Sequence, residues 1–212
     1  MAAPVIALDL RSKAFGAREV LGPISLAIAP GETVALTGPS GAGKTTLLRI
    51  LAGLDRAFDG TLTAPERIAI VFQEPTLLPW RDARANIRLT TGVGAETAER
   101  LLGEVGLRGR GDAYPGQLSL GQQRRLALAR ALAAEPELLL LDEPFVSLDP
   151  ALVEEMLELT ARALARRETA SVFVTHARAE AERLADRVLT LGGDPARVVS
   201  EEIVGETSAH RP

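Results

Sequence analysis

Cysteine is absent from the 212-residue chain, which excludes a disulfide framework and thiolate chemistry and fits a reducing cytosol. Long apolar runs are absent too. The longest uncharged ones, such as residues 138–141, fall far short of the roughly 20 residues that a membrane-spanning helix needs. The first residues lack a basic leader and reach an acidic side chain at Asp9, so we expect no secretion signal. These absences predict a globular protein without a membrane span.

Lysine is scarce: only two of the 24 basic residues are lysines, Lys13 and Lys44. The formal net charge of −4 argues against broad nucleic-acid binding, so we expect no nucleic-acid partner. The length suits one domain, or a domain with an inserted lobe. Lys44 lies in a glycine-rich stretch, where a compact ammonium suits phosphate better than a guanidinium does, although coincidence would also explain its place.

The glycine-rich stretch fits the phosphate-binding pattern G-x-x-x-x-G-K-[ST]. Glycines let backbone N–H groups turn toward triphosphate oxygens, and Lys44 adds a positive charge for the outer phosphates. Thr45 offers a hydroxyl to Mg²⁺, and the following helix points its partly positive N-terminus at the anion. The residues expected to bind the nucleotide are Gly38, Pro39, Ser40, Gly41, Ala42, Gly43, Lys44, Thr45 and Thr46. The alternative is a glycine-rich turn with a solvated lysine, but a strand predicted over 33–37 and a helix over 45–52 supply the required context.

Short β-prone segments precede this loop and predict an antiparallel platform. They cover residues 5–10, 18–21 and 24–28, with turns at 15–17 and 22–23. Phe15 lies in the first turn, where its ring could stack on a nucleotide base; packing on its own sheet is an equally good explanation. After the loop helix, Asp59-Gly60 predicts a hairpin-type turn.

Polar residues follow three further predicted strands, which cover 68–72, 138–141 and 171–175. Ligands of α/β sheets gather at the carboxyl ends of strands, so Gln73 is placed to reach Mg²⁺ or the attacking water. We expect Asp142 to point toward the metal and Glu143 to accept a proton from water attacking the γ-phosphate. His176 emerges at the third strand end. The alternatives are a surface glutamine, a solvated acidic turn and a structural histidine.

Helical signals replace strand signals over residues 74–136, which predicts an inserted helical lobe with helices at 96–105 and 120–134. Ser119 and Gln122 have capping-box spacing, so Ser119 and Gly121 are expected at an exposed helix N-terminus. An ordinary cap is the alternative. The remaining elements expected are a helix from 150, a helix at 177–185, a strand at 187–191, a terminal pair around 198–204 and a loose tail at 207–212.

Together these residues resemble the nucleotide-binding subunit of ATP-binding-cassette (ABC) transporters over nearly the whole chain. The matching segments are the Walker A loop at Gly38 to Thr46, the Q-loop Gln73, the signature at Leu118 to Gln122, Walker B at Leu138 to Glu143, the D-loop at Ser147 to Asp149, and the switch His176. Phe15 matches the position where the family places an aromatic ring against adenine. Two positions depart from the family: Leu120 stands where a glycine is usual, and Ala177 replaces a common aspartate.

The resemblance implies an α/β fold with a P-loop NTPase (RecA-like) core sheet, an N-terminal antiparallel β subdomain and an inserted helical subdomain. One domain would span residues 1–212, with the helical part at roughly 74–136. It also implies a head-to-tail homodimer with two ATP molecules, each held by one subunit's Walker A and the other's signature, here Ser119, Gly121 and Gln122. The implied catalytic residues are Glu143, His176 and Gln73, and the implied Mg²⁺ ligands are Thr45, Gln73 and Asp142.

The segment around Trp80 is similar to that of nitrate, sulfonate and taurine importers, and the family docks a permease near residues 74–84. We therefore expect an ATPase on the cytoplasmic face of the cell membrane that drives import of a small anionic solute through a separate permease, with a solute-binding protein in the full system. Trp80 could instead only anchor the lobe. The rival functions are an exporter or lipid-extraction ATPase, a soluble ABC ATPase, a regulatory module that does not hydrolyse ATP, and a GTPase.

Overall fold

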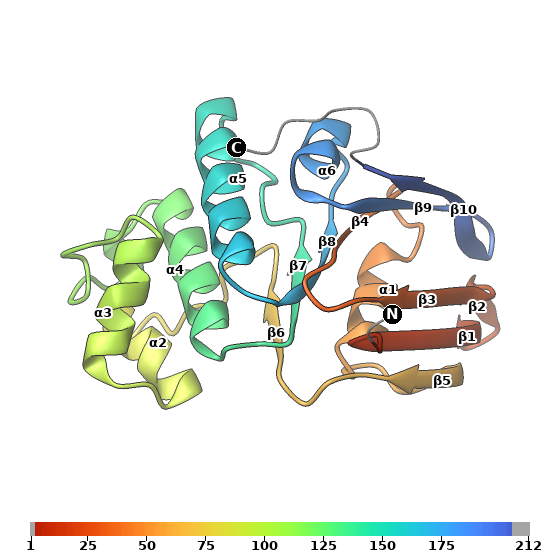
Figure 1. Cartoon of the computed structure of the whole chain (residues 1–212), viewed down its shortest axis with the longest axis horizontal. Helices are drawn as coiled ribbons and strands as arrows, with labels where there is room; N and C mark the ends of the chain where they lie inside the picture. Colours follow the sequence, from red (N-terminus) through yellow and green to blue (C-terminus); the bar gives the residue numbers. More distant parts are fainter. Residues whose placement is uncertain (1–2, 205–212) are drawn as a thin grey trace.

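Three strands of the core are buried along nearly their whole length, as expected for strands that are covered on both faces. The structure is a computed structural model and describes residues 3–204. The core strands run in the order β6-β7-β8-β4-β9, all parallel, and β10 lies antiparallel beside β9 (Figure 1). Their bounds are β4 (Thr33–Thr37), β6 (Ile68–Val71), β7 (Leu138–Asp142), β8 (Ala170–Val174), β9 (Arg187–Gly193) and β10 (Ala196–Ile203).

Four antiparallel strands form a platform at one end of the molecule, coloured red to orange in Figure 1; three of them were predicted, and β5 was not. They are β1 (Ile6–Phe15), β2 (Arg18–Leu21), β3 (Ile24–Ile28) and β5 (Asp59–Thr63). The hairpin turn predicted at Asp59-Gly60 is wrong, because both residues belong to β5 and pair with β1. Gly60 has φ +145°, and a Cβ there would lie 2.2 Å from the carbonyl oxygen of Asp9. The glycine therefore marks a close approach of two backbones rather than a turn.

The sheet separates the core into two apolar clusters, and helices cover both faces. α1 (Lys44–Leu51) and the platform pack on one face, and α5 (Pro150–Ala165) and α6 (Arg178–Leu184) pack on the other. β7 illustrates the division, since Leu138 and Leu140 join the first cluster while Leu139 and Leu141 join the second. Successive side chains of a strand point to opposite faces, so one unbroken leucine run fills both clusters.

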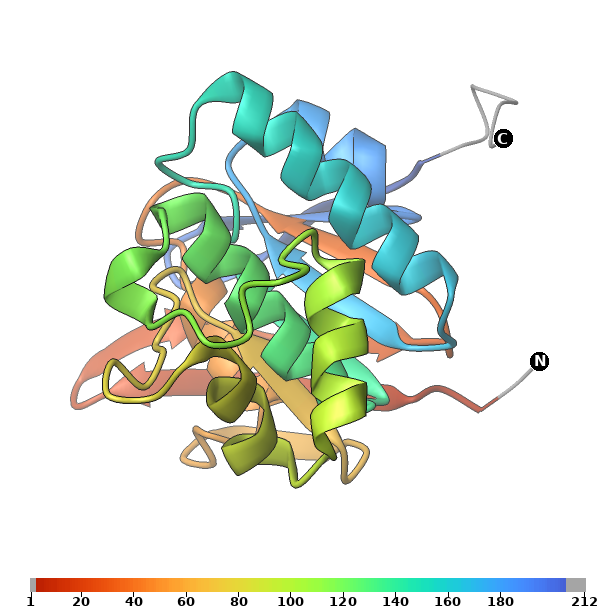
Figure 2. The ribbon, with the colours of Figure 1, turned by 90° about the vertical axis from the view of Figure 1, so that its left-hand side faces the viewer.

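The inserted helical lobe lies at the opposite end from the platform and faces the viewer in Figure 2. It contains α2 (Ala83–Thr91), α3 (Ala95–Glu104), α4 (Leu120–Ala133) and a 3₁₀ turn, η1 (Pro115–Gln117), all between β6 and β7. The predicted helices at 96–105 and 120–134 agree with α3 and α4 to within one residue at each end. α2 was not predicted. The fold class is confirmed, while the bounds of the domain and of the lobe stay a prediction.

The C-terminal elements follow the expected order, with α6 after β8 and the β9–β10 hairpin after α6. The loose tail predicted at 207–212 lies outside the described residues. None of the helices described between residues 3 and 204 has the length and apolar character needed to cross a membrane.

Candidate active site

The phosphate loop joins β4 to α1, and two of its glycines are required by close contacts. Gly38 has φ +137°, and a Cβ there would lie 2.4 Å from the carbonyl oxygen of Leu191. Gly43 has φ +80°, and a Cβ there would lie 2.5 Å from Cδ2 of Leu21. Both positions have a positive φ that favours glycine. At Gly38 the close atom belongs to the backbone of β9, so this position also lacks space for a Cβ.

Lys44 is buried at the first turn of α1, with only 5% of its surface exposed. Its Nζ donates hydrogen bonds to the carbonyl oxygens of Gly38 at 2.9 Å and Pro39 at 2.8 Å. Burial lowers the pKa of Lys44, and the negative charges of Glu143 and Asp142 oppose that shift. The ammonium is thus held against the loop, on the side where the two carboxylates lie.

Asp142 ends β7 next to α1, and the Thr45 hydroxyl donates to its Oδ1 at 3.2 Å. Burial raises the pKa of Asp142; Glu143 adds to the rise, while Thr45, Arg49 and Lys44 counteract it. A carboxylate in this position gains from a nearby cation. A hydroxyl and a carboxylate are hard oxygen donors, and Mg²⁺ commonly takes only one or two protein ligands beside phosphate and water. The pair therefore fits Mg²⁺.

Glu143 and His176 form a second pair at the same edge of the sheet. Nε2 of His176 lies 2.9 Å from Oε1 of Glu143. Glu143 has φ +48°, and its N–H donates to the carbonyl oxygen of Val174 at the end of β8. This hydrogen bond fixes the turn after β7, so that the carboxylate meets the imidazole. A carboxylate oriented by a histidine is a suitable acceptor for a proton from water.

Gln73 follows β6 at the same edge. Val71 of β6 pairs with Leu141 of β7, so Gln73 and Glu143 each lie two residues beyond a matched pair. The side chain of Gln73 is exposed, and no hydrogen bond joins it to another residue within 3–204. The structure therefore brings Gln73 to the correct edge without fixing where its amide points.

Ser119, Gly121 and Gln122 begin α4 and are not joined to the phosphate loop by any hydrogen bond of the described chain. Ser119 Oγ accepts from the Gln122 N–H at 3.3 Å, and Gln122 Oε1 accepts from the Ser119 N–H at 3.0 Å, which is the predicted capping box. Ser119 is exposed as expected, but the expectation of an exposed Gly121 is wrong, because Gly121 is buried. It packs on α5, where a Cβ would lie 2.5 Å from Cδ2 of Leu152. The capping box therefore accounts for Ser119 and Gln122, and the contact with α5 accounts for Gly121, without a ligand.

Phe15 is the last residue of β1 rather than part of the turn, and 55% of its surface is exposed. The ammonium of Lys13 lies 4.5 Å from the ring centroid. Lys13 is almost fully buried, and its Nζ donates to Asp55 Oδ1 at 2.7 Å and to the Ala57 carbonyl oxygen at 2.8 Å. One face of the ring therefore meets a fixed cation. This role of Lys13 was not predicted from the sequence, although it is one of only two lysines.

Arg124 of α4 was also missed, and it links that helix to the turn that carries Glu143. Its side chain is 5% exposed, Nη1 donates to the Pro144 carbonyl oxygen at 3.3 Å, and Nε has no partner within residues 3–204. Burial lowers the pKa of Arg124. A guanidinium inside an otherwise apolar helix face was the available sequence signal.

The segment after Gln73 is held by two further residues that the sequence analysis overlooked. Arg130 donates to the carbonyl oxygens of Pro75 at 3.1 Å and Thr76 at 2.9 Å. Asn86 is fully buried in α2; its Nδ2 donates to three carbonyl oxygens and its Oδ1 accepts from the Leu78 N–H. These bonds fix a loop from which Trp80 projects with 67% of its surface exposed.

Comparisons with known proteins agree on one family. The sequence model of the ABC transporter family matches residues 21–146. An aliphatic sulfonates import ATP-binding protein SsuB of Granulibacter bethesdensis is 47% identical over 99% of this chain and 88% of its own length. An SsuB protein of a Mycobacterium species is 48% identical over 90% of this chain and 81% of its own length. A dimeric structure of the ATP-binding cassette MJ0796, in a post-hydrolysis state with ADP and Pi, matches with a TM-score of 0.81 and 28% identity over 94% of this chain and 99% of the other.

Proposed function

The chain belongs to the ABC transporter family as an ATP-binding, ATP-hydrolysing subunit, and from this premise we propose that it drives the import of aliphatic sulfonates or similar small organic anions. The observation that carries the ATP-hydrolysis part of the proposal is the pair of contacts at one sheet edge, Thr45 to Asp142 and Glu143 to His176, beside the phosphate loop. The sulfonate class rests on relatives named as sulfonate import proteins, one of them aligned over 99% of this chain.

In the proposed site, the loop from Gly38 to Thr46 holds the ATP phosphates through its N–H groups and the Lys44 ammonium. Thr45, Asp142 and Gln73 would hold Mg²⁺, which neutralises charge on the phosphates and orients them. Glu143 accepts the proton of the water that attacks the γ-phosphate, and His176 orients that carboxylate and contacts the phosphate. Phe15 stacks on adenine with its exposed face.

The α4 N-terminus completes this site only in a dimer. Ser119, Gly121 and Gln122 have no hydrogen bond to the phosphate loop of their own chain in the described part, and they form a helix start of the kind that binds anions. We propose a head-to-tail homodimer in which these residues meet the γ-phosphate bound by the other subunit. The dimeric state of the ADP-bound neighbour supports the dimer.

The exposed loop that carries Trp80 is the proposed docking site of a membrane permease. Arg130 and Asn86 hold its backbone, so force applied to the loop reaches α2 and α4. Such a subunit would lie on the cytoplasmic face of the membrane, with a solute-binding protein completing the system. The import function named for the relatives supports this assembly over the exporter and soluble ATPase alternatives.

The test is co-purification of the tagged chain from detergent-solubilised membranes of its own cells, followed by mass spectrometry. A multi-span permease is expected, together with a solute-binding protein whose ligand can then be measured with ethanesulfonate, taurine and nitrate. The assembly is then reconstituted, and ATP-dependent uptake is compared with that of a Glu143→Gln assembly. Recovery of ribosomal or DNA-repair proteins without a permease would contradict the transport function. A permease whose binding protein takes no sulfonate would contradict only the substrate class.

A further inference from the structure

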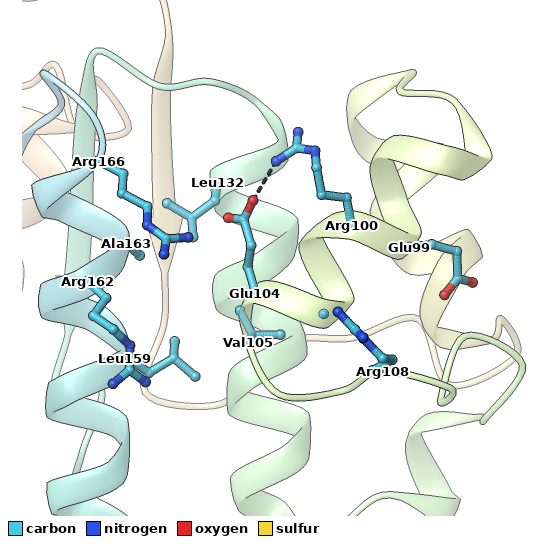
Figure 3. A pocket seen from close by; sticks show the side chains of 11 residues that line it. Glu99, Arg100, Glu104, Val105, Arg108, Leu132, Leu159, Arg162, Ala163 and Arg166 are labelled. Atoms are coloured by element: carbon cyan, nitrogen blue, oxygen red, sulfur yellow. Dashed lines mark hydrogen bonds and ion pairs between the residues drawn. The ribbon is translucent and has the colours of Figure 1, made fainter.

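Glu180 of α6 is a partly buried carboxylate whose partner is a hydroxyl rather than a cation. A carboxylate removed from water needs an ion pair or a hydrogen bond. Glu104, at the pocket between α3 and α5, is paired with the guanidinium groups of Arg100 and Arg167 (Figure 3). Across residues 3–204, no arginine or lysine pairs with Glu180, which accepts a hydrogen bond from the Thr175 hydroxyl. Its side chain is therefore bound to the residue that precedes His176.

Thr175 closes a short turn around His176. It is buried directly after β8, and its N–H donates to the carbonyl oxygen of Leu36 at 3.2 Å. Its Oγ1 accepts a hydrogen bond from the N–H of Ala177 at 3.0 Å. A hydroxyl has a single proton to donate, and that proton goes to Glu180, so an oxygen lone pair is left to face Ala177. The hydroxyl thus joins the two residues that flank the histidine.

The start of α6 explains why this arrangement is needed. Its N-cap residue is Ala177, which has no side-chain oxygen to cap the helix. In a capping box, the side chain of the third helical residue accepts from the N–H of the N-cap residue. The third residue here is Glu180, but Thr175 takes that N–H, and Glu180 reaches it only through the hydroxyl. The bond between Thr175 and Glu180 therefore takes the place of a cap.

The orientation of His176 depends on this turn. Its side chain is 43% exposed, and within residues 3–204 Glu143 is its only hydrogen-bond partner. The backbone on either side of His176 therefore has a large part in setting where the ring points. Burial raises the pKa of Glu180, while the Thr175 hydrogen bond and the charge of His176 oppose that rise. The carboxylate thus lies near enough to the imidazole to interact with it by charge as well.

We propose that Glu180 is a positioning residue for His176. By holding the Thr175 hydroxyl, it fixes the turn over residues 175–177, and this turn directs the imidazole toward Glu143. The consequence for ATP hydrolysis rests on the roles proposed above for His176 and Glu143. In the described chain Glu180 makes no hydrogen bond to the phosphate loop or to Glu143, so it acts on the reaction through the histidine.

The first test is steady-state ATP hydrolysis by the full chain. Glu180→Ala should lower kcat by roughly tenfold to ~10²-fold, because the histidine loses its fixed geometry, while the KM for ATP stays unchanged. Glu180→Gln keeps an oxygen that accepts from Thr175, so its kcat should stay within about threefold of wild type. Glu182→Ala is the matched control, since Glu182 is exposed on the same helix and pairs with Arg178. It should hydrolyse ATP as the wild type does, and melting temperatures check that each variant folds.

Thr175 gives a second pair of variants. Thr175→Val removes the hydroxyl with little change of shape and should lower kcat as Glu180→Ala does, whereas Thr175→Ser should not. The double variant Thr175→Val with Glu180→Ala should be no slower than the slower single variant, because both changes break the same bond. Losses that multiply in the double variant would show that the two residues act separately, which would overturn the proposal.

An NMR measurement tests the position of the ring without ATP. The chain has two histidines, so comparison with His176→Ala identifies the imidazole signals of His176. Glu143→Gln should shift these signals, since Glu143 contacts the ring. Glu180→Ala should reduce or abolish that shift, and Glu180→Gln should preserve it.

The outcomes separate the two proposals. Wild-type turnover in His176→Ala would contradict the role of His176 in hydrolysis, and the NMR comparison would still decide whether Glu180 positions it. The positioning role is overturned if the shift caused by Glu143→Gln persists unchanged in Glu180→Ala, or if Glu143→Gln causes no shift at all. It is also overturned if Glu180→Ala hydrolyses ATP at the wild-type rate while His176→Ala does not.

Discussion

Glu143 and His176 share a hydrogen bond of 2.9 Å, while neighbouring Asp142 bonds Thr45 at 3.2 Å. Two adjacent carboxylates are thereby committed to different partners. Asp142 continues the strand and meets the hydroxyl at the start of α1, while the positive φ of Glu143 turns it toward β8. The local backbone therefore separates a candidate metal ligand from a candidate base. That separation lets two acidic residues in sequence take different roles.

We expect Glu143→Gln to slow ATP hydrolysis by ~10²–10⁴-fold, because an amide cannot accept the proton of the attacking water. ATP binding should be retained, since the phosphate loop and Lys44 are untouched. Phosphate release under steady-state conditions measures the first effect, and nucleotide titration measures the second. Lys44→Ala is the contrasting variant and should lose ATP affinity. Turnover at the wild-type rate in Glu143→Gln would eliminate this residue as the base.

Lys13 is expected to position Phe15 for stacking on adenine, because its buried ammonium lies 4.5 Å from the ring centroid. Lys13→Met should weaken ATP binding by about 0.5–2 kcal/mol, or roughly 2- to 30-fold, the range of a cation–π contact. Affinity for inorganic tripolyphosphate, which has no base, should not change. Lys13→Arg should restore part of the ATP affinity. If tripolyphosphate binding falls equally, Lys13 supports the loop as a whole and not the ring.

The start of α4 shows what a sequence can predict about an element. Its capping box spans four consecutive residues, Ser119 to Gln122, so the start of the helix could be predicted correctly from the sequence. The all-leucine strand β7 was also predictable, because it lacks any alternation. These signals are local, and no distant contact overrides them.

α2 shows the opposite case. Its sequence is mostly polar. Its buried Asn86 side chain forms hydrogen bonds with backbone groups of the loop at 78–82, so its burial gives no apolar helical pattern. Gly60 was misassigned for a similar reason, since its need for glycine comes from Asp9 on another strand. The Glu143–His176 edge was predicted from strand ends and family resemblance, whereas Lys13, Arg124 and Arg130 act through partners far along the chain. Such partners cannot be identified from local pattern.

α3 is tied to the segment after α5 by Glu104, whose carboxylate accepts from Arg167 at 2.9 Å with both side chains about 20% exposed. The folded pKa of Glu104 lies below its ordinary value, so this contribution is present above the unfolded pKa of about 4.3 and is lost as pH falls through the folded pKa. We expect Glu104→Gln to destabilise the chain by about 1 kcal/mol at pH 7.

Urea unfolding at a series of pH values measures this effect, and the difference from wild type should shrink once the pH falls below about 4. Glu158→Gln is the control, because Glu158 is half-exposed and contacts Arg162 only at 3.3 Å within its own helix. Its effect should stay within about 0.5 kcal/mol. A Glu104→Gln difference that persists unchanged into the acid range would show that charge is not the source.

The two elements that we propose face the nucleotide lie apart in the molecule. The phosphate loop lies between the platform and the core sheet, whereas the signature residues begin α4 in the helical lobe at the other end (Figure 1). Arg124 joins α4 to the turn after Glu143, and Gly121 packs on Leu152 of α5. Movement of the lobe would therefore shift the turn that carries the proposed base, Glu143. A second copy, arranged head to tail, would supply the signature that each phosphate loop lacks in its own chain.

Leu120 lies in the first turn of α4 with 44% of its surface exposed, so its side chain would meet the partner in the proposed dimer. An additional side chain at a packed contact typically costs 1 kcal/mol or more, so we expect Leu120→Gly to strengthen ATP-dependent dimerisation by roughly fivefold or more. Light scattering across a concentration series, in a Glu143→Gln background that preserves ATP, measures the dissociation constant. Leu89→Gly, at an exposed leucine of α2, controls for the loss of a leucine from a helix. An unchanged dimer constant for Leu120→Gly would mean that this side chain points away from the partner, and the departure from glycine would then have no bearing on closure.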